Sequence, residues 1–445
     1  MSHSRRSFLG IAVGSVAFCE SAHRVAPGED RPRVTEPRAT SGDEAVEPEW
    51  TERLTITVGN RDADLCGNSE RTIQAAVDYA ARLGGGTVKL LPGTYKFRNA
   101  VYLRSRVKLI GSGEESVCIK EPSRKTRLAQ DSDWYDQEIT LQEADGFQVG
   151  DGVCLRTRNP HNGGQDVVKR TLVARSGQRF KLDRALRNNF WTQGESTVAT
   201  LFPLLSGDEI SDVVIENLVL DGNRTNNENL DGNYAGCIFL QDCNRVAMRS
   251  VTARNYNGDG FSWQICHDVV VENCHSHGHA GLGLHPGSGS QRPVMRNNRL
   301  RDNNIGIFFC WGVKYGLAEG NLLEGNKCGI SVGHRDTDNR IAQNIVRNST
   351  DVGILFRPER GKAFAPHRNR VEGNTLENNG VQRSGIAVDI QGETEDIAVV
   401  RNTIRDDRPA EQRIGIRVGP ATRGIQIAEN SIRGMMIEVQ DQRQP

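Results

Sequence analysis

The most constraining feature of this 445-residue chain is a short phrase that recurs about nine times between residues 211 and 434. Each copy has an asparagine-like residue, then polar residues, then a glycine that opens an alternating apolar run. Most asparagine-to-asparagine steps are 23 to 30 residues, which is the spacing of one coil of a solenoid. The asparagine position falls at Asn217, Ser250, Asn273, Asn298, Asn321, Asn344, Asn374, Asn402 and Asn430.

The glycine of each copy starts four or five residues of period-2 alternation, which predicts a short strand with one buried face. With the glycine as position zero, positions one and three point inward, and positions two and four point outward. Asparagine suits the tight bend before the next strand, and stacked amides can bond to one another as a ladder. The opening glycines are Gly236, Gly260, Gly281, Gly306, Gly329, Gly353, Gly385 and Gly415.

This repeat resembles the right-handed parallel β-helix proteins of the pectate-lyase-like superfamily, and residues 69–113 add to the resemblance. The stretch SERTIQAAVDYAARLGGGTVKLLPGTYKF is similar to the amphipathic helix, GGGTV strand and LPxGTY-like turn that precede the first coils in that family. The resemblance implies an all-β fold: a right-handed parallel β-helix (solenoid) with an N-terminal capping helix and a β-rich insertion. It says little about chemistry, because the fold hosts lyases, hydrolases, epimerases and non-catalytic binders.

Five segments follow one another along the chain. Residues 1–19 carry Arg5 and Arg6 before an apolar run, resemble a twin-arginine export signal, and predict a periplasmic or secreted protein. Residues 20–50, with prolines among many charges, predict a disordered linker. We expect the N-terminal cap and first coils in 51–116, the β-rich insertion in 117–205 and the parallel β-helix in 206–445.

The amino-acid composition limits the kinds of molecule that the chain can bind. Lysine plus arginine and aspartate plus glutamate number 56 each, so the chain has no global field for nucleic acid. No stretch after the leader could span a membrane. We expect a polysaccharide partner.

Ten cysteines, six of them from Cys237 to Cys328, are compatible with disulfides in an exported protein or with buried thiols.

The glycine alignment serves as a crude map of the surface, because equivalent positions on neighbouring coils lie ~4.8 Å apart. Loops 221–235 and 358–369 flank the resulting strip, and a walled groove with ionisable groups is the usual place for polysaccharide binding in this superfamily. Outward position four holds Gln264, His285, Cys310, Gly333, Arg357 and Asp389. Just beyond it lie Trp311, His334, Arg335, Glu359 and Arg360.

Histidine and arginine in this strip favour a polysaccharide lyase that cleaves an anionic, uronate-containing glycan by β-elimination. That reaction needs the uronate carboxylate neutralised, which suits arginine, and the C5 proton removed, which suits a neutral histidine. The catalytic candidates are His285, His334, Arg335 and Arg357. The candidate substrate contacts are Asp259, Gln264, His279, Trp311, Glu359, Arg360 and Asp389.

Two alternatives remain open. In the first alternative the protein is a glycoside hydrolase whose two carboxylates are Glu359 and either Asp389 or Asp336. On the map Glu359 and Asp389 lie ~8 Å apart, within the ~6.5–9.5 Å that separates the two carboxyl groups of inverting glycosidases. A glycan-binding solenoid would use the same strip without catalysis. The stretch from Asn257 to Gly260 resembles the Asn-Thr-Asp-Gly of polygalacturonases. However, His279-Ala280 replaces that family's paired aspartates and its Gly-His-Gly element is missing, which speaks against hydrolysis of that type.

Metal binding has weaker sequence support. His275, His277 and His279 alternate, so an extended chain would place all three on one side, either as metal ligands or as turn residues at the groove edge. No fourth ligand is evident. The aspartates that could form a calcium site of the pectate-lyase kind are scattered: Asp221, Asp231, Asp259 and Asp336. We therefore expect no metal and no cofactor.

Overall fold

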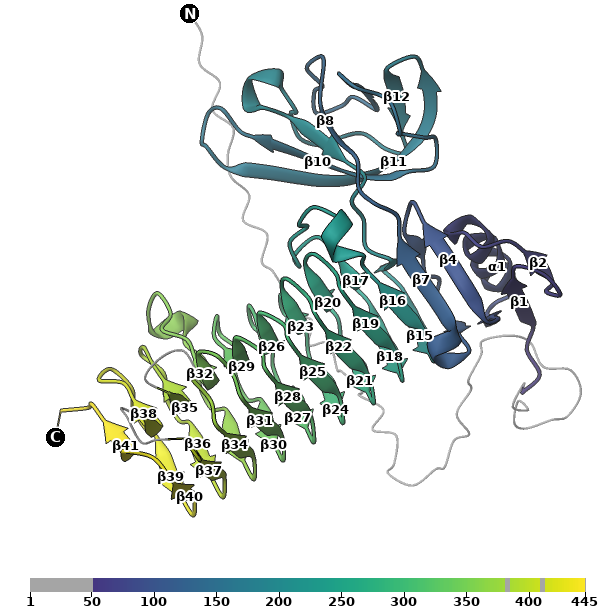
Figure 1. The fold of residues 1–445 in the computed structure, drawn as a ribbon. Helices are drawn as coiled ribbons and strands as arrows, with labels where there is room; N and C mark the ends of the chain where they lie inside the picture. The colour runs from purple at the N-terminus through teal and green to yellow at the C-terminus, as the bar shows by residue number, and fades with distance from the viewer. Residues whose placement is uncertain (1–50, 381–384, 409–412, 445) are drawn as a thin grey trace, which may run out of the picture. The chain divides into compact units, whose positions relative to one another are not determined.

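Three short strands per repeat give the chain its architecture. The computed structural model spans residues 1–445 and describes residues 51–380, 385–408 and 413–444. Within these, strands of successive repeats stack in parallel into three long sheets, which we call sheets A, B and C (Figure 1). The fold is a right-handed parallel β-helix, which confirms the prediction from the repeat.

The strands of each sheet are given from the N-terminal end of the column. Sheet A contains β2 (Leu65–Cys66), β1 (Thr55–Gly59), β3 (Gly86–Leu90), β6 (Val107–Ile110), β15 (Ser211–Glu216), β18 (Asn244–Arg249), β21 (Val270–Glu272), β24 (Val294–Arg296), β27 (Leu317–Glu319), β30 (Arg340–Ala342), β33 (Arg370–Glu372), β36 (Ala398–Val400) and β39 (Gln426–Ala428). Sheet B contains β4 (Gly93–Phe97), β7 (Ser116–Lys120), β16 (Val219–Asp221), β19 (Thr252–Arg254), β22 (His275–His277), β25 (Arg299–Arg301), β28 (Leu322–Glu324), β31 (Ile345–Arg347), β34 (Thr375–Glu377), β37 (Thr403–Arg405) and β40 (Ser431–Arg433). Sheet C contains β5 (Val101–Tyr102), β14 (Leu205–Asp208), β17 (Gly236–Gln241), β20 (Asp259–Gln264), β23 (Leu282–Gly287), β26 (Ile305–Phe308), β29 (Cys328–Val332), β32 (Val352–Phe356), β35 (Ile386–Ile390), β38 (Ile414–Val418) and β41 (Ile437–Asp441).

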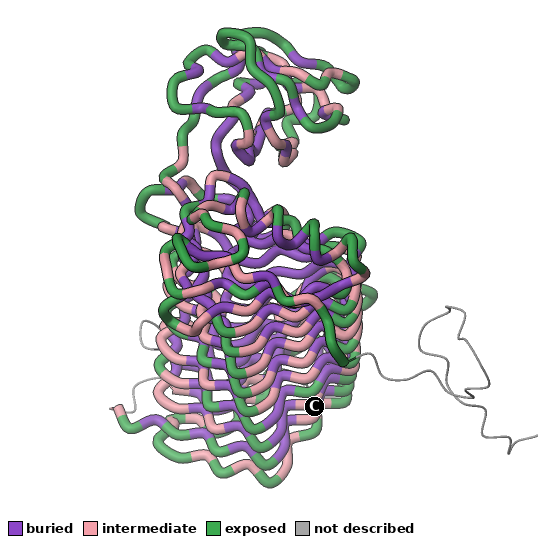
Figure 2. Tube along the Cα trace, turned by 90° about the vertical axis from the view of Figure 1, so that its right-hand side faces the viewer, coloured by how far each residue is buried: buried purple, intermediate pink, exposed green. Residues whose placement is uncertain are grey.

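The hydrophobic core fills the interior of the column with side chains from alternate strand positions. Phe261, Trp263, Ile307 and Phe309 are fully buried, at the inward positions that the alternation predicts. Figure 2 shows the same sequence of buried and exposed stretches repeated from coil to coil. Burying each such side chain contributes about 1.5–3 kcal/mol to stability, so the stacking of coils is driven largely by these rows.

The glycine alignment is wrong by one residue at Gly236, which pairs with Asp259, and by two residues in two other coils of sheet C. His285 pairs with Ser262, and Asp389 pairs with Leu355, so both occupy outward position two and not position four. The glycine equivalent to Gly260 is Gly283. The physical reason is that a shift of two residues leaves the inward and outward alternation unchanged, so the apolar pattern alone accepts either register.

Close backbone approach explains the glycine column itself. A Cβ on Gly283 would lie 2.6 Å from the carbonyl oxygen of Gly306, and one on Gly306 would lie 2.7 Å from that of Gly329. A Cβ on Gly329 would lie 2.4 Å from the carbonyl oxygen of Gly353. Successive coils therefore need the smallest residue at this position of sheet C.

Buried asparagines between sheets A and B form the predicted ladder from Asn298 to Asn430. The Oδ1 atom of Asn344 accepts the backbone N–H of Asn321 at 3.0 Å and its Nδ2 at 2.8 Å. The Nδ2 atom of Asn344 donates to the carbonyl oxygen of Ala318 at 2.9 Å. Each rung therefore satisfies backbone groups that the bend would otherwise leave buried and unpaired.

The ladder prediction is wrong by one residue in the first three coils. Asn217, Ser250 and Asn273 adopt left-handed backbone conformations (φ 55°, 51° and 55°) in the bend that precedes the ladder position. The ladder position after Asn273 is Cys274, whose backbone N–H donates to Oδ1 of Asn298 at 2.9 Å. The bend position and the ladder position are adjacent, and both accept asparagine, so the sequence alone does not show which of the two a given asparagine occupies.

A second ladder lies between sheets B and C and includes a histidine. The backbone N–H of His279 donates to Oδ1 of Asn303 at 3.1 Å, and Nδ1 of His279 accepts the backbone N–H of Tyr256 at 3.1 Å. Its Nε2 lies 3.2 Å from the carbonyl oxygen of Ala253. A ring that accepts at Nδ1 and donates at Nε2 is neutral, and burial lowers the pKa of His279 to about 3.

Helix α1 (Glu70–Arg82) covers the N-terminal end of the column, as predicted. Its fully buried residues Ile73, Ala76, Val77 and Ala80 lie on one face, and the helix packs against β1 and β3. Gly84, Gly85 and Gly86 follow with positive φ angles that end the helix. A helix in this place protects strand edges that would otherwise be open to pairing.

The β-rich insertion contains an antiparallel sheet with a hydrophobic cluster of its own, which includes Leu155, Phe180 and Phe190. In sheet order its strands are β8 (Lys125–Arg127), β13 (Thr197–Ala199), β10 (Gly152–Arg158), β11 (Gln165–Ser176), β12 (Arg179–Leu182) and β9 (Glu138–Thr140). Short 3₁₀ helices span Gly113–Glu115, Thr192–Gly194, Arg224–Asn226 and Lys362–Phe364.

The predicted export signal in 1–19 and linker in 20–50 lie outside the described residues. In the part of the chain that the structure describes, no helix has the length and apolar character needed to cross a bilayer. The cysteines of the same part are free thiols, and those other than Cys66 and Cys310 are buried. Of the two alternatives for the cysteines, the described residues follow the buried-thiol one.

Replacing Asn344 by alanine should lower the free energy of unfolding by about 2–4 kcal/mol, because two donors of Asn321 and the carbonyl of Ala318 lose their buried partner. Urea-induced unfolding measures this change. The Asn430→Ala variant, at the partly buried end of the same ladder, should lose less than half as much. Equal losses in the two variants would contradict a stabilising role for the interior rungs.

The His279→Asn variant should resist acid better than the wild type. The folded-state pKa of about 3 lies below the unfolded value, so the contribution of His279 is complete above the unfolded pKa and is lost as pH falls toward 3. With an unfolded pKa of ~6.5, the wild type should lose about 3 kcal/mol more than the variant between pH 7 and pH 4. Thermal unfolding across this pH range tests the difference, with His161→Asn, an exposed histidine of the insertion, as the control.

Candidate functional site

The ends of β26, β29 and β32 bring four predicted site residues together beside sheet C: Trp311, His334, Arg357 and Glu359. His334 and Arg335 follow β29 in consecutive left-handed conformations, with φ angles of 44° and 68°. Bulky residues adopt this conformation at a cost of about 1–3 kcal/mol each, and residues such as Ile265 and Tyr315 adopt it at bends of other coils. We call these four residues the His334 cluster.

Arg357 links three coils. Its Nη1 donates to Oγ of Ser331 at 2.7 Å, and its Nη2 donates to the carbonyl oxygen of Phe309 at 2.9 Å. Its Nε lies 3.4 Å from Oε1 of Glu359, and the guanidinium stands 4.3 Å from the ring centroid of Phe308. The side chain is 16% exposed, so the guanidinium is fixed and only part of it faces solvent.

His334 is the accessible imidazole of the cluster, with 29% of its side chain exposed. Its Nε2 lies 3.2 Å from Oε2 of Glu359, and its Nδ1 lies 3.4 Å from Nη2 of Arg357 and 3.6 Å from Sγ of Cys310. Its ring centroid is 4.9 Å from that of Trp311. Burial, and then the charge of Arg357, lower the pKa of His334, so the ring is neutral at pH 7.

Asp336 supports the cluster from beneath. Its Oδ1 accepts the backbone N–H groups of Gly312 and Val313 at 2.9 Å each, and its Oδ2 accepts that of Gly333 at 3.0 Å. Oδ2 also lies 3.6 Å from Nη2 of Arg357. Burial raises the pKa of Asp336 to about 7. The carboxyl group is fully buried and holds the turns that carry Trp311 and His334.

An exposed aromatic and cationic surface borders the cluster. Trp311 is 41% exposed, and the guanidinium groups of Arg335 and Arg360 lie 5.8 and 5.1 Å from its ring centroid. Both guanidinium groups also face the ring of Phe364, at 4.9 and 4.2 Å. Arginines stack on aromatic faces through cation–π attraction while keeping N–H groups free for a carboxylate. We call Trp311, Arg335, Arg360 and Phe364 the aromatic platform.

Asp259 and His285 also come together, but inside the protein. Nδ1 of His285 lies 2.8 Å from Oδ2 of Asp259, and Oδ1 of Asp259 accepts the backbone N–H of Leu282 at 2.9 Å. Both side chains are 3% exposed, and the Nε2 of His285 is buried without a hydrogen-bond partner. Loop 221–235 contributes the carbonyl oxygen of Gly232, which accepts a hydrogen bond from Ser262 beside this pair at 2.6 Å.

Three other candidates have local partners apart from the His334 cluster. The Nε2 of Gln264, which is buried, donates to Oγ of Ser262 at 3.2 Å. Asp389 is ion-paired with Arg417, whose Nε donates to its Oδ1 at 2.9 Å. His279 is a rung of the second ladder, and its buried ring bonds to backbone groups.

Neither suggested carboxylate pair offers two free carboxyl groups. Register places Asp389 beside Leu355, four residues before Glu359, where the sequence map placed it two residues before. Asp389 is held by Arg417. Asp336 is fully buried and accepts three backbone N–H groups. The geometry therefore gives little support to the two-carboxylate alternative.

Sequence reasoning missed Phe308, Ser331 and Phe364. Phe308 pairs with Ser331 at outward position two, and both contact Arg357. The same glycine alignment could have indicated them if position two had been weighed beside position four. Phe364 lies in loop 358–369. A loop lacks the two-residue alternation of a strand, so its sequence does not indicate which side chains face the site.

Among residues 51–380, 385–408 and 413–444, no group of three or more histidine, cysteine, aspartate or glutamate side chains is arranged to hold a metal ion. The idea that His275, His277 and His279 lie on one side of the chain is wrong. His275 and His277 stack with ring centroids 4.3 Å apart, whereas His279 follows the end of β22 and turns into the interior. Side chains alternate between two faces only within strand β22, which ends at His277, so His279 does not follow the alternation.

The arrangement suits proton transfer beside a bound anion. A neutral imidazole is held at Nε2 by a carboxylate, and the contacts of its Nδ1 are longer than the ~2.7–3.2 Å of ordinary hydrogen bonds. Two exposed guanidinium groups and an exposed indole lie next to it. Such a site can hold a planar or ring-shaped anion and accept a proton from it.

Comparison with known proteins identifies the fold and leaves the chemistry open. A family model described as a right handed beta helix region matches residues 211–357, and one described as periplasmic copper-binding protein (NosD) matches residues 312–444. No curated protein matches the chain. Neither family model covers half of the chain, and the first agrees with the β-helix described above.

Solved structures agree with this architecture. The A-module of the mannuronan C-5 epimerase AlgE4 from Azotobacter vinelandii is similar with 15% identity and a TM-score of 0.55, over 87% of this chain and 100% of that chain. The DFA-IIIase of Arthrobacter chlorophenolicus A6 gives 12% identity and a TM-score of 0.50, over 85% and 87%. The Dettilon tailspike protein gives 12% identity and a TM-score of 0.51, over 82% and 60%. At these identities the likeness shows the fold alone.

The Arg357→Gln variant should have a higher His334 pKa than the wild type, because the charge of Arg357 contributes to lowering it. Proton NMR titration of the His334 ring, assigned with a His334→Gln variant, measures the change. Arg292→Gln removes an exposed arginine that is paired with Asp268 and should leave the pKa as it is. An unchanged or lower pKa in Arg357→Gln would contradict the electrostatic coupling.

Proposed function

We propose that the protein is an exported enzyme of the pectate-lyase-like superfamily that cleaves a uronate-containing polysaccharide by β-elimination at the His334 cluster. The observation that carries the proposal is the neutral, accessible imidazole of His334, fixed by Glu359 and bordered by the cations of Arg335 and Arg360. Localisation in the periplasm or outside the cell follows from the twin-arginine-like leader and accords with the periplasmic description of one matching family.

Substrate recognition uses the aromatic platform. A sugar ring stacks on the exposed face of Trp311, and its carboxylate accepts hydrogen bonds from the exposed guanidinium groups of Arg335 and Arg360. Neutralising the carboxylate makes the neighbouring C5 proton more acidic, because the charge that develops on deprotonation is stabilised. Both cations already stand against Trp311 and Phe364, so little side-chain entropy is lost when the substrate binds.

Proton abstraction falls to His334. Oε2 of Glu359 lies 3.2 Å from Nε2, and a carboxylate at this distance favours the tautomer with the proton on Nε2, which leaves the lone pair on Nδ1. Nδ1 takes the C5 proton, the electrons of the C–H bond form a C4–C5 double bond, and the C4–O bond breaks. The departing oxygen takes a proton from solvent or from the imidazolium. Glu359 stabilises that imidazolium as it forms.

Elimination is favoured over hydrolysis because neither Asp336 nor Asp389, the two proposed partners of Glu359, offers a free carboxylate beside it. Inverting and retaining glycosidases need two accessible carboxyl groups at a defined separation. Asp336 is fully buried, and Asp389 is ion-paired with Arg417. Removal of a C5 proton would equally begin an epimerisation, so polymannuronate, the substrate class in the name of the similar A-module, belongs in the test.

Incubation with polygalacturonate, polymannuronate, glucuronate-containing glycans and neutral polysaccharides should separate the alternatives. The expected result is ultraviolet absorbance from the new double bond together with new reducing ends, on a uronate polymer only. New reducing ends without ultraviolet absorbance would show that the enzyme is a hydrolase and not a lyase. Binding without either product would indicate a glycan-binding solenoid.

The His334→Ala variant should lose about 10²–10⁴-fold in kcat, the usual contribution of a general base. Arg335→Ala should chiefly raise KM, by about tenfold, because it removes a charge-assisted contact to the substrate. His161→Ala, in the insertion, and Arg292→Ala, which lies just before β24 and is ion-paired with Asp268, are the matched controls and should retain activity. Wild-type turnover in His334→Ala would remove this residue from the mechanism.

A further inference from the structure

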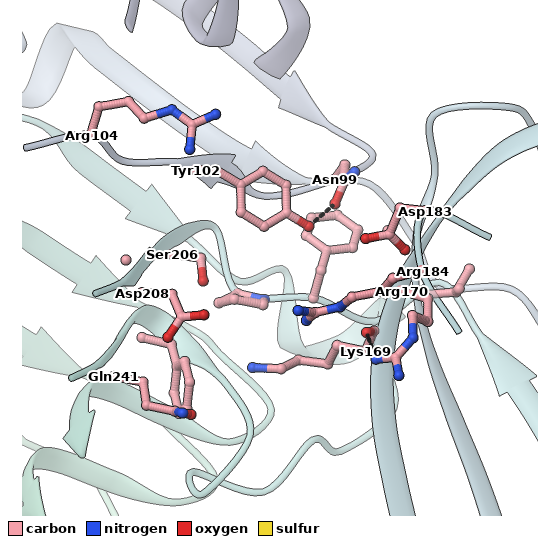
Figure 3. Close-up of a pocket in the computed structure, with 16 residues that line it drawn as sticks. Asn99, Tyr102, Arg104, Lys169, Arg170, Asp183, Arg184, Ser206, Asp208 and Gln241 are labelled. Carbon is pink, nitrogen blue, oxygen red and sulfur yellow. Dashed lines mark hydrogen bonds between the residues drawn. The ribbon is translucent and has the colours of Figure 1, made fainter. Parts of the chain in front are cut away.

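A second concave site lies where the insertion meets the first coils of sheet C (Figure 3). Its volume is about 480 Å³, within the ~300–1,000 Å³ typical of ligand pockets. The insertion contributes Lys169, Arg170, Asp183 and Arg184 to its lining. The coils contribute Asn99, Tyr102, Ser206, Asp208, Phe239 and Gln241.

Two of its cations are placed to meet a ligand. Figure 3 shows the Lys169 amine extending across the pocket toward Asp208 and Gln241. That amine bonds to the carbonyl oxygen of Tyr234 and stands 3.8 Å from the ring centroid of Phe239. Desolvation lowers the pKa of Lys169 to about 8, so the amine remains mostly protonated at neutral pH.

Arg184 is exposed and, within the described residues, makes no hydrogen bond or ion pair. Arg170 differs, because its guanidinium donates to the carbonyl oxygens of Ala185 and Leu186 and so serves the fold of the insertion. Arg104 at the edge of the pocket is paired with Asp78. Arg184 therefore offers the free guanidinium of this pocket.

Tyr102 supplies an apolar surface among these charges. It is 41% exposed, and its hydroxyl lies 3.4 Å from Oδ1 of Asn99 and 3.3 Å from Oγ1 of Thr171. The hydroxyl contacts fix the ring at the mouth of the pocket. A fixed aromatic ring beside hydroxyl, amide and carboxylate groups is the surface that a sugar ring needs for stacking and hydrogen bonding.

We propose that this pocket binds a uronate residue of an anionic glycan, with the carboxylate at Arg184 and Lys169 and the sugar ring against Tyr102. Asp208 and Gln241 then face the sugar hydroxyls, and the negative charges of Asp183 and Asp208 are outnumbered by the four cations that line the pocket. The choice of a uronate as ligand rests on the proposed function.

Register puts the pocket on the same face as the His334 cluster. Ser206 and Asp208 of β14 pair with Phe239 and Gln241 of β17, at outward positions two and four of sheet C. From β17 to β29 is four strand steps, or ~19 Å along the column. A glycan chain of several sugars lying along the column can therefore occupy both places, which makes the pocket a distal subsite.

Calorimetric titration of the full chain carrying His334→Ala, with sodium glucuronate and with glucose, tests the proposal without turnover. We expect glucuronate to bind and glucose to bind at least tenfold more weakly, since it lacks the carboxylate. The Arg184→Gln substitution in this background should weaken glucuronate binding about tenfold, and Tyr102→Leu should weaken both sugars. Arg184 has no internal hydrogen bond, so its replacement should leave the fold unchanged.

Two controls separate this pocket from the rest of the molecule. Arg179→Gln removes an exposed arginine of the same insertion, paired with Glu138, and should leave glucuronate binding unchanged. With Arg335→Ala added to the His334→Ala background, which removes one cation of the aromatic platform, the loss caused by Arg184→Gln should persist, and this distinguishes the pocket from the platform. No glucuronate binding, or equal binding in Arg184→Gln, would overturn the subsite. Arg184-dependent binding in a wild-type protein that shows no turnover would overturn only the proposed function.

Discussion

The structure depends on hydrogen bonding between successive coils at their bends. A strand pair in the middle of a sheet satisfies its own backbone groups, but a bend buried inside the column does not. The rungs from Asn298 to Asn430 solve this problem by accepting and donating across each coil interface. Because every rung is also the neighbour of the next, the ladders fix the register of all three sheets. His279 shows that a neutral imidazole, with one donor and one acceptor, can take the place of an asparagine in a rung.

That fixed register is what builds a site from residues far apart in sequence. Trp311, His334 and Arg357 come from three successive repeats, and each lies at the end of a strand of sheet C. Arg357 reaches back across two coils to the carbonyl oxygen of Phe309, and Asp336 ties the turns together beneath it. The imidazole is thus oriented by a rigid scaffold, while the aromatic platform stays exposed to solvent.

The insertion extends the same face at the other end of sheet C. It brings Lys169 and Arg184 beside outward positions of β14 and β17, where the coils alone would offer only Ser206, Asp208 and their neighbours. The β-helix supplies length and regular spacing, and the insertion supplies a concave wall. This arrangement suits an elongated anionic glycan, because contacts spaced along the column can bind separate sugars of the same glycan chain.

The sequence by itself determined the solenoid, the phase of most of its strands, the capping helix and the cluster of Trp311, His334 and Arg357, because apolar alternation and coil spacing are local properties. It did not determine the register of His285 and Asp389, since a two-residue shift preserves the same alternation. Nor did it show that His285 is covered or that the insertion forms a pocket. Those features were decided by the tertiary structure, because they depend on hydrogen bonds between coils and on loops whose positions no local period encodes.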